Sequence, residues 1–352
     1  MPAIAHDVLL APLTTLGIGG PARDFVRATT LDELREVLRA GEQLLVLGGG
    51  SNVVIGDAGW DGLVVQIGLP GVEIELRDDH ALVTAAAGVA WDDFVAQMVA
   101  AELAGVECLS GIPGLVGATP MQNVGAYGQE VADTITRVRA MYRHTGELVD
   151  FTREGCGFAY RTSRFKGTDR WVIADVTFRL ERRGTSVPLR YPELTRALGV
   201  GEGERAPLAD VRRRVIELRR GKGMVVDPAD PQSRSAGSFF TNPIVDAATF
   251  AAFVARLPEG VTAPSWPAAG GTTKLSAAWL IERAGFAKGT TRGRAGISTK
   301  HALALVNRGG ATASELLALA REIQDGVRER LGIELVPEPV IVQRIAAAGP
   351  TL

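Results

Sequence analysis

A serine in an apolar setting is the first residue of this sequence whose type and position invite chemistry. Residues 235–243 read "SAGSFFTNP", so Ser238 stands between a glycine and two phenylalanines, and Asn-Pro ends the segment. Two interpretations are open: a hydroxyl that is bonded within a turn, or an alcohol placed to give up a proton. Because an alkyl alcohol is a poor acid in water, the second role requires a very basic acceptor or support for the alkoxide. The segment alone does not decide between them.

Two glycine-rich stretches are candidates for holding a phosphate-bearing ligand. The apolar run 44–47 leads directly into "GGGSN" (48–52), and consecutive glycines let backbone N–H groups face one concavity that suits a phosphate. It is not a Walker A loop, because no Gly-Lys-Ser/Thr follows, nor a GxGxxG turn, because "VVIG" after it has an extended pattern. The second stretch, "IPGLVGATPMQNVGAYGQE" (112–130), lacks periodicity, and long loops of this kind are usually functional. Together they could grip one dinucleotide, although a tight turn and a plain crossover remain the alternatives.

The elements that position these stretches begin as a small α/β unit and then change character. A helix is predicted over 29–40, with Thr30 and Glu33 at the spacing of a capping box, and buried strands over 44–47 and 62–67. From about residue 70, "GVEIEL" and "ALVTAAAGV" alternate like antiparallel strands. A helix over 91–103 follows, and its apolar stripe is predicted to be core: Trp91, Phe94, Val95, Met98, Val99 and Leu103.

The last third of the chain is predicted to be helical, with a closing strand. A loose connection over 185–209 is a plausible domain boundary, and the helix 210–224 after it faces Val211, Val215 and Leu218 inward, with Gly221 or Gly223 at its end. Two more helices, 274–286 and 312–332, follow, the second capped by Thr312 and Glu315. The run "IELVPEPVIVQ" is the final strand, and no internal repeat is found.

Composition excludes several classes of function. The 352 residues are 46% hydrophobic and 22% charged with a formal net charge of −2, which gives no argument for nucleic acid or an anionic membrane as a partner. The only two cysteines, Cys108 and Cys156, form no CxxC pair, so a disulfide framework or a zinc site is not expected. The sequence shows neither a signal peptide nor an apolar run of the roughly 18 residues that span a bilayer. We therefore expect a cytoplasmic protein without a bound metal.

Taken together, motifs spread over nearly the whole chain resemble the UDP-N-acetylenolpyruvoylglucosamine reductase family. They occur in the family's order: "LGIGGPA", "LGGGSNVVI", "IPGLVGATPMQNVGAYGQE", "FAYRTSRFK", "SAGSFFTNP", "KLSAAWLIERAGF" and "ELVPEPVIV". The resemblance implies an NADPH-dependent flavoenzyme that reduces the enolpyruvyl group of UDP-N-acetylenolpyruvoylglucosamine to UDP-N-acetylmuramate, for peptidoglycan synthesis. "LRYPELTRAL" (189–198) is similar to the subgroup whose loop carries a tyrosine, here Tyr191, that closes over the substrate.

The family's fold is an α+β arrangement: a two-subdomain FAD-binding module of the vanillyl-alcohol-oxidase type and a C-terminal substrate-binding domain. The resemblance implies FAD-binding subdomains over 1–69 and 70–207 and the substrate domain over 208–334. The strand near 335–345 is expected to return to the first subdomain. No histidine or cysteine stands out as a covalent tether, so FAD is expected to be noncovalent. The implied FAD-binding residues are Gly48, Gly49, Gly50, Ser51, Asn52, Ile112, Pro113, Gly117, Ala118, Pro120, Asn123, Gly125, Ala126 and Tyr127.

Reduction of an enol ether of pyruvate sets two demands, and the resemblance assigns three residues to them. Hydride addition pushes negative charge into the carboxylate, and Arg161 suits that charge because a guanidinium is permanently charged and binds carboxylate in a forked geometry. Glu338 stands between Pro337 and Pro339, which stiffen its backbone, and next to a carboxylate it is expected to be protonated and to donate to the enolate oxygen. Ser238 would supply the proton. From the residues alone, without the resemblance, the favoured interpretation of Glu338 is a solvated glutamate on an edge strand.

Substrate binding is assigned to further residues: Tyr160, Tyr191, Arg219, Lys222, Asn242 and Lys274. Of these, Tyr160 could orient the substrate, Lys274 could reach a phosphate, and the candidates for the UDP part are Arg219 and Lys222, with Asn242 and Tyr127. The family often has a lysine where Thr241 stands, and the region "RRGKGMVVDP" departs from its usual pattern, so which of Arg219, Arg220 and Lys222 contacts the diphosphate is open. Cations at the end of helix 210–220 would also complement its dipole. The four histidines form no cluster.

Two other functions are weighed against the reductase. One is an oxidase of the same flavin fold that acts on an alcohol or a sugar, which would consume oxygen without NADPH. The other is a non-catalytic nucleotide-sugar sensor, in which Arg161, Ser238 and Glu338 should be eroded, whereas all three are intact. No obligate protein partner is evident from the sequence.

Overall fold

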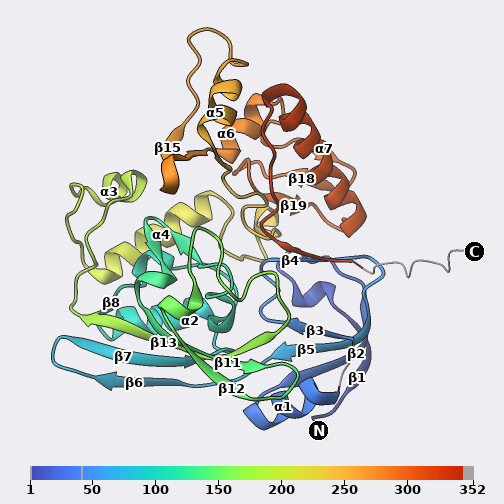
Figure 1. Ribbon diagram of the computed structural model, residues 1–352, viewed down its shortest axis with the longest axis vertical. Coiled ribbons are helices and arrows are strands. Elements are labelled where there is room, and N and C mark those ends of the chain that lie inside the picture. The colour runs from blue at the N-terminus through green and yellow to red at the C-terminus, as the bar shows by residue number, and fades with distance from the viewer. Residues whose placement is uncertain (1, 41–42, 344–352) are drawn as a thin grey trace, which may run out of the picture. The chain divides into compact units, whose positions relative to one another are not determined.

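The computed structural model describes residues 2–40 and 43–343, and these fall into two compact units (Figure 1). The first unit comprises residues 1–8, 22–50 and 60–225, and the second comprises 9–21, 51–59 and 226–352. The first unit therefore includes the connection 185–209, and the predicted division into three domains remains a prediction. Each unit has its own hydrophobic core.

A mostly parallel sheet of four strands forms the N-terminal part of the first unit. Its order is β1 (Ala5–Leu9), β2 (Pro21–Ala28), β5 (Trp60–Ile67), β3 (Leu44–Leu47), and β5 pairs in parallel with β2 and β3. Helix α1 (Leu31–Ala40) connects β2 to β3, as the sequence predicts. Its capping box is present, because the Glu33 N–H donates to Thr30 Oγ1 at 3.1 Å and the Thr30 N–H to Glu33 Oε2 at 3.1 Å.

An antiparallel sheet forms the rest of the first unit. Its order is β12 (Leu148–Thr152), β11 (Ile135–Tyr142), β13 (Trp171–Arg182), β7 (His80–Ala86), β6 (Val72–Leu76), and β8 (Leu103–Ala104) also pairs with β13. Helix α2 (Trp91–Ala100) packs on this sheet through Phe94, whose ring centroid lies 5.0 Å from that of Phe178 on β13. The predicted apolar stripe is core, although Val99 is only partly buried. Two further helices complete the unit, α3 (Pro192–Leu198) and α4 (Leu208–Gly221), together with the short hairpin β9 (Gly125–Ala126) and β10 (Gln129–Glu130).

The second unit combines short strands with three helices. Strand β4 (Val53–Ile55) pairs in parallel with β20 (Val340–Val342). Two antiparallel sheets have the orders β14 (Ile244–Val245), β16 (Thr273–Leu275), β15 (Ser265–Pro267) and β17 (Thr291–Arg292), β18 (Ala295–Ile297), β19 (Leu305–Asn307). The helices are α5 (Ala247–Val254), α6 (Ala277–Arg283) and α7 (Ala313–Leu331). Helix α7 begins with the predicted capping box of Thr312 and Glu315.

Several elements differ from the prediction. The helix predicted over 91–103 ends at Ala100, because Leu103 and Ala104 pair with β13 as a strand. Helix α6 is shorter than predicted, because Lys274 pairs with strands on both sides, Leu275 pairs with Ser265, and Ser276 caps the helix. The final strand is limited to Val340–Val342, since Pro337 and Pro339 lack the N–H that a strand needs, and residues 344–345 of the prediction lie outside the described residues. Helix α3 was missed inside the connection 185–209, although Pro192 at its first turn and Gly199 at its end are typical helix boundaries.

Candidate functional site

The two glycine-rich stretches come into contact within the first unit. A Cβ built on Gly49 would lie 2.8 Å from the Cα of Gly114, and one on Gly117 would lie 2.5 Å from the Cβ of Ala87. Gly50 and Gly114 both have positive φ, 62° and 113°. Glycine allows backbones to approach this closely and adopt these angles, so the loop after β3 and the stretch 112–130 pack together as one glycine surface. The contact brings two predicted FAD-binding stretches together, and the FAD-binding role of their glycines remains a prediction.

Arg161 stands in a tight left-handed turn of the same unit. The backbone of Ala159 and that of Thr162 bond each other in both directions, at 3.1 and 3.2 Å, and Arg161 between them has a φ of 52°. Its guanidinium donates from Nη2 to the Gly125 carbonyl at 2.8 Å and from Nη1 to the Asn123 carbonyl at 3.4 Å. Tyr160 supports it from beside, with the guanidinium carbon 5.3 Å from the ring centroid. The guanidinium is therefore held by the same stretch that contributes to the glycine surface.

A second cluster in the first unit gathers the residues assigned to the diphosphate. The rings of Tyr127 and Tyr191 meet edge to face at 5.3 Å, and Lys222 Nζ lies 5.4 Å from the Tyr127 ring centroid. Lys222 also donates to Glu193 Oε2 at 2.5 Å. Burial raises the pKa of Tyr127 to about 12, although Arg219 nearby acts in the opposite direction, so its hydroxyl stays protonated.

Arg219 is the cation of this cluster with unused hydrogen-bonding capacity. Its side chain is half-buried, Nη2 donates to the Met224 carbonyl at 2.8 Å, and its shielded Nε has no hydrogen-bond partner among the described residues. Burial lowers the pKa of Arg219, opposed by the negative charge of Asp92, but an arginine remains charged at neutral pH. A shielded positive charge with a spare donor is suited to an anion.

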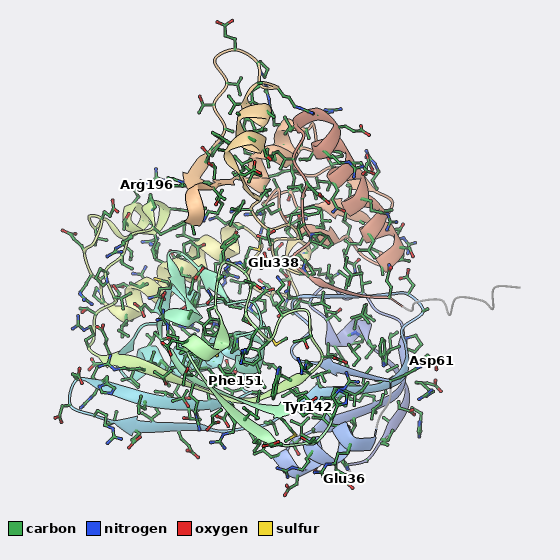
Figure 2. All side chains as sticks on the ribbon, in the orientation of Figure 1. Glu36, Asp61, Tyr142, Phe151, Arg196 and Glu338 are labelled. Carbon is green, nitrogen blue, oxygen red and sulfur yellow. The ribbon has the colours of Figure 1, made fainter. Side chains whose placement is uncertain are left out.

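The second unit brings Ser238 and Glu338 onto adjacent segments. The Glu338 N–H donates to the Phe239 carbonyl at 2.8 Å, and the Thr241 N–H donates to the Val336 carbonyl at 3.1 Å. Ser238 is half-buried next to Phe239 and Phe240, which are fully buried in the hydrophobic core of the second unit, and their predicted role as an apolar wall for the reaction remains a prediction. Glu338 lies on the extended segment before β20 (Figure 2).

The end of the GGGSN stretch belongs to this second unit and is hydrogen-bonded to the segment that carries Glu338. Asn52 Nδ2 donates to the Glu338 carbonyl at 3.4 Å, and the Val340 N–H donates to the Asn52 carbonyl at 3.0 Å. Ser51 precedes Asn52 in this stretch, which is predicted to hold FAD. A candidate FAD-binding residue and two candidate catalytic residues are therefore neighbours.

Two assigned substrate residues of the second unit also have structural contacts. Asn242 Oδ1 accepts from the Ala277 N–H at 2.9 Å, which fixes the start of α6. Lys274 Nζ lies 6.0 Å from the ring centroid of Trp266, an exposed tryptophan on the neighbouring strand. Both residues remain candidates for the nucleotide.

The structure divides the predicted catalytic trio. Arg161 belongs to the first unit, whereas Ser238 and Glu338 belong to the second. The structure brings the latter two together, and convergence of all three on one substrate remains a prediction. Sequence reasoning missed Glu193, although an acidic residue in the first turn of a helix is a recognisable signal. It also missed Glu130, which gave no signal beyond its place in "AYGQE".

Residues 2–40 and 43–343 contain neither a cluster of metal ligands nor a membrane-spanning helix. Within these ranges no group of three or more histidine, cysteine, aspartate or glutamate side chains could hold a metal ion. None of the helices in the same ranges is both long and apolar enough to cross a bilayer.

Comparisons with known proteins agree on one family. A family model described as FAD binding domain matches residues 22–152, and one described as UDP-N-acetylenolpyruvoylglucosamine reductase, C-terminal domain, matches 228–342. The reductase of that name from Thermobifida fusca is 54% identical over 97% of this chain and 98% of its own. Its counterpart from Streptomyces coelicolor is 54% identical over 96% of this chain and 90% of its own.

A solved structure gives the same result at lower identity. The crystal structure of UDP-N-acetylenolpyruvylglucosamine reductase from Thermus caldophilus is 27% identical, covers 97% of this chain and 100% of its own, and has a TM-score of 0.67. The predicted α+β fold class, an FAD-binding module with a C-terminal reductase domain, is confirmed.

Proposed function

We infer the function from one premise: the chain belongs to the UDP-N-acetylenolpyruvoylglucosamine reductase family. It is an FAD-containing, NADPH-dependent oxidoreductase that reduces the enolpyruvyl group of UDP-N-acetylenolpyruvoylglucosamine to give UDP-N-acetylmuramate, a peptidoglycan precursor. The main support for this function is the 54% identity to the Thermobifida fusca reductase over nearly the full length of both proteins. We place the reaction in the cytoplasm, where the nucleotide sugar is made, with no partner beyond small molecules.

Bound FAD supplies the hydride, which it takes from NADPH. When bound, FAD would be held at the glycine surface formed by Gly48–Gly50 and the stretch 112–127, whose peptide N–H groups suit its diphosphate. A side chain at Gly49 would clash with Gly114 and one at Gly117 with Ala87, so glycine at these positions allows the close packing that shapes this surface.

Arg161 binds the carboxylate of the enolpyruvyl group and stabilises the charge that hydride addition pushes into it. Its two backbone acceptors and the tight turn fix the guanidinium before the substrate arrives, so little reorganisation is needed at the moment of reaction. One such preorganised donor typically contributes about 3–4 kcal/mol to the transition state.

Ser238 and Glu338 complete the reaction from their adjacent segments. Ser238 gives a proton to the carbon that carries the developing negative charge, and the protonated Glu338 donates to the enolate oxygen. The apolar wall of Phe239 and Phe240 excludes water, which strengthens both interactions. The distance between the Ser238 and Glu338 backbones is fixed by the bond from the Glu338 N–H to Phe239.

The substrate is held by the remaining candidates: Tyr160, Tyr191, Arg219, Lys222, Asn242 and Lys274. The edge-to-face contact of Tyr191 with Tyr127 supports membership of the subgroup in which a tyrosine loop closes over the substrate. The unpartnered Nε of Arg219 favours Arg219 and Lys222, rather than the exposed Arg220, for the diphosphate.

Separate measurement of the two half-reactions tests these roles. The purified protein should be yellow, NADPH should reduce its flavin under anaerobic conditions, and the enolpyruvyl substrate should reoxidise it. In Ser238→Ala, reduction by NADPH should be unchanged and reoxidation by substrate should be about 100- to 10,000-fold slower, the range expected for loss of a general acid. Equal loss of both half-reactions would refute the role of Ser238. Oxygen consumption without any need for NADPH would instead favour an oxidase.

A further inference from the structure

Glu130 takes no part in the reaction as described, yet hydrogen bonds connect it to the turn that carries Arg161. The first bond in this connection runs from Asn123 Nδ2 to Glu130 Oε2, at 2.7 Å. All the groups concerned belong to the first unit.

Asn123 is the central member of the connection. It is 1% exposed and has a φ of 49°, and both the nitrogen and the oxygen of its side-chain amide make hydrogen bonds. Besides the bond to Glu130, Nδ2 donates to the Ala159 carbonyl at 3.3 Å, and Oδ1 accepts from the Ala132 N–H at 3.1 Å. A buried amide with three protein partners has one orientation, because any rotation leaves a polar atom unpaired.

Ala159 is the first residue of the tight turn that carries Arg161, so the bond from Asn123 acts on that turn directly. A left-handed conformation at a residue other than glycine is strained and persists only where its surroundings enforce it. Here Arg161 adopts such a conformation at the tip of the turn.

A second route joins Glu130 to the guanidinium itself. Glu130 pairs with Gly125 across the hairpin β9–β10, and the Gly125 carbonyl accepts from Arg161 Nη2 at 2.8 Å. A Cβ on Gly125 would lie 2.8 Å from Glu130 Cγ and 3.2 Å from Arg161 Nη1, so the three residues are in close contact. Glu130 therefore supports both the turn and one of the acceptors that Arg161 uses.

A pocket lies beside the turn that carries Arg161, on the side that faces Glu130 and Asn123, so side-chain packing there is incomplete and hydrogen bonds must hold the turn. Glu130, Asn123, Ala159 and Tyr160 line a pocket of about 380 Å³. The side chains around an open pocket do not restrict the turn from that direction, so loss of a hydrogen bond there lets it relax.

We propose that Glu130, acting through Asn123, is a positioning residue that holds the guanidinium of Arg161 in its reactive place. The proposal rests on the proposed role of Arg161 toward the substrate carboxylate. Glu130 touches neither the substrate nor the flavin in this account, and its effect is on the geometry of Arg161.

Half-reaction kinetics of Glu130→Ala test the proposal. Reoxidation of reduced flavin by the enolpyruvyl substrate should slow by about 10- to 100-fold, the usual effect of a small misplacement of a reacting group, while reduction by NADPH stays within about 2-fold. Glu130→Gln keeps an oxygen that can accept from Asn123 and should retain most of the rate. Asn123→Asp, nearly the same shape, should repel Glu130 and slow reoxidation like Glu130→Ala. Glu154→Ala is the matched control, because Glu154 lines the same pocket.

Combination with Arg161→Ala separates positioning from a general loss of structure. If Glu130 acts through Arg161, adding Glu130→Ala to Arg161→Ala should change reoxidation by less than about 2-fold. The same slowing in both backgrounds, or unchanged reoxidation in Glu130→Ala and Asn123→Asp, would overturn the proposal alone. Normal reoxidation in Arg161→Ala would overturn the proposed role of Arg161 and this inference with it.

Discussion

The ion pair between Lys222 and Glu193 gives a prediction about substrate affinity. Lys222, a candidate for the substrate diphosphate, already has an anionic partner 2.5 Å away. The diphosphate must compete with that carboxylate. In Glu193→Gln the partner is neutral, and the substrate should bind more tightly.

The size of the effect follows from the exposure of the pair. The side chains of Lys222 and Glu193 are 30% and 35% exposed, so solvent screening keeps the net interaction to about 0.5–1 kcal/mol. That energy corresponds to a decrease in KM for the substrate of about 2- to 5-fold, with kcat little changed.

The assay is the initial rate of NADPH oxidation at several substrate concentrations and two ionic strengths. The decrease in KM should shrink at high salt, because both the ion pair and its competition with the diphosphate are screened. Asp210→Asn is the control: it removes the same charge from an exposed ion pair with Arg213 on α4, joined at 2.7 Å. An increase in KM for Glu193→Gln would refute the competition and indicate that Glu193 helps to place Lys222. An equal decrease in Asp210→Asn would show only an effect of net charge.

Two further predictions concern the first unit. Gly49→Ala would place a Cβ 2.8 Å from the Gly114 backbone, so we expect about 1–3 kcal/mol of destabilisation and less flavin per protein by absorbance. Gly221→Ala is the control: no atom lies within 4 Å of its new Cβ, so this variant should keep the stability and the flavin content of the unchanged protein. Full flavin content in Gly49→Ala would contradict the argument from the close approach to Gly114. Asp92 is partly buried, which raises its pKa, but bonds from Arg212 at 2.6 and 2.9 Å and from the Gly111 N–H outweigh burial, so the pKa is lowered overall. Its contribution to stability should be complete above the ordinary aspartate pKa of about 4 and lost as the pH falls through the lowered value. In Asp92→Asn, the free energy of unfolding measured with urea should fall less as the pH is lowered. An unchanged loss of stability at low pH would show that other carboxylates are responsible for it.

Local signals in the sequence predicted the helices that carry their own boundaries. Thr30 with Glu33 and Thr312 with Glu315 mark helix starts that need only neighbouring residues, and the structure confirms both. Prediction failed where distant strands decide the conformation. Lys274 has a helical sequence context but is a strand residue, because it pairs with Ile244 on one side and Trp266 on the other.

The sequence by itself determined the family, the fold class and the candidate residues, because motifs in a fixed order depend only on residue types along the chain. The contact of Gly49 with Gly114, the adjacency of Ser238 and Glu338, and the connection from Glu130 through Asn123 to the Arg161 turn were decided only by the tertiary structure. These groups are brought together by strand pairing and by hydrogen bonds between residues far apart in the chain. Such contacts leave no local pattern, because their partners are chosen when the core packs.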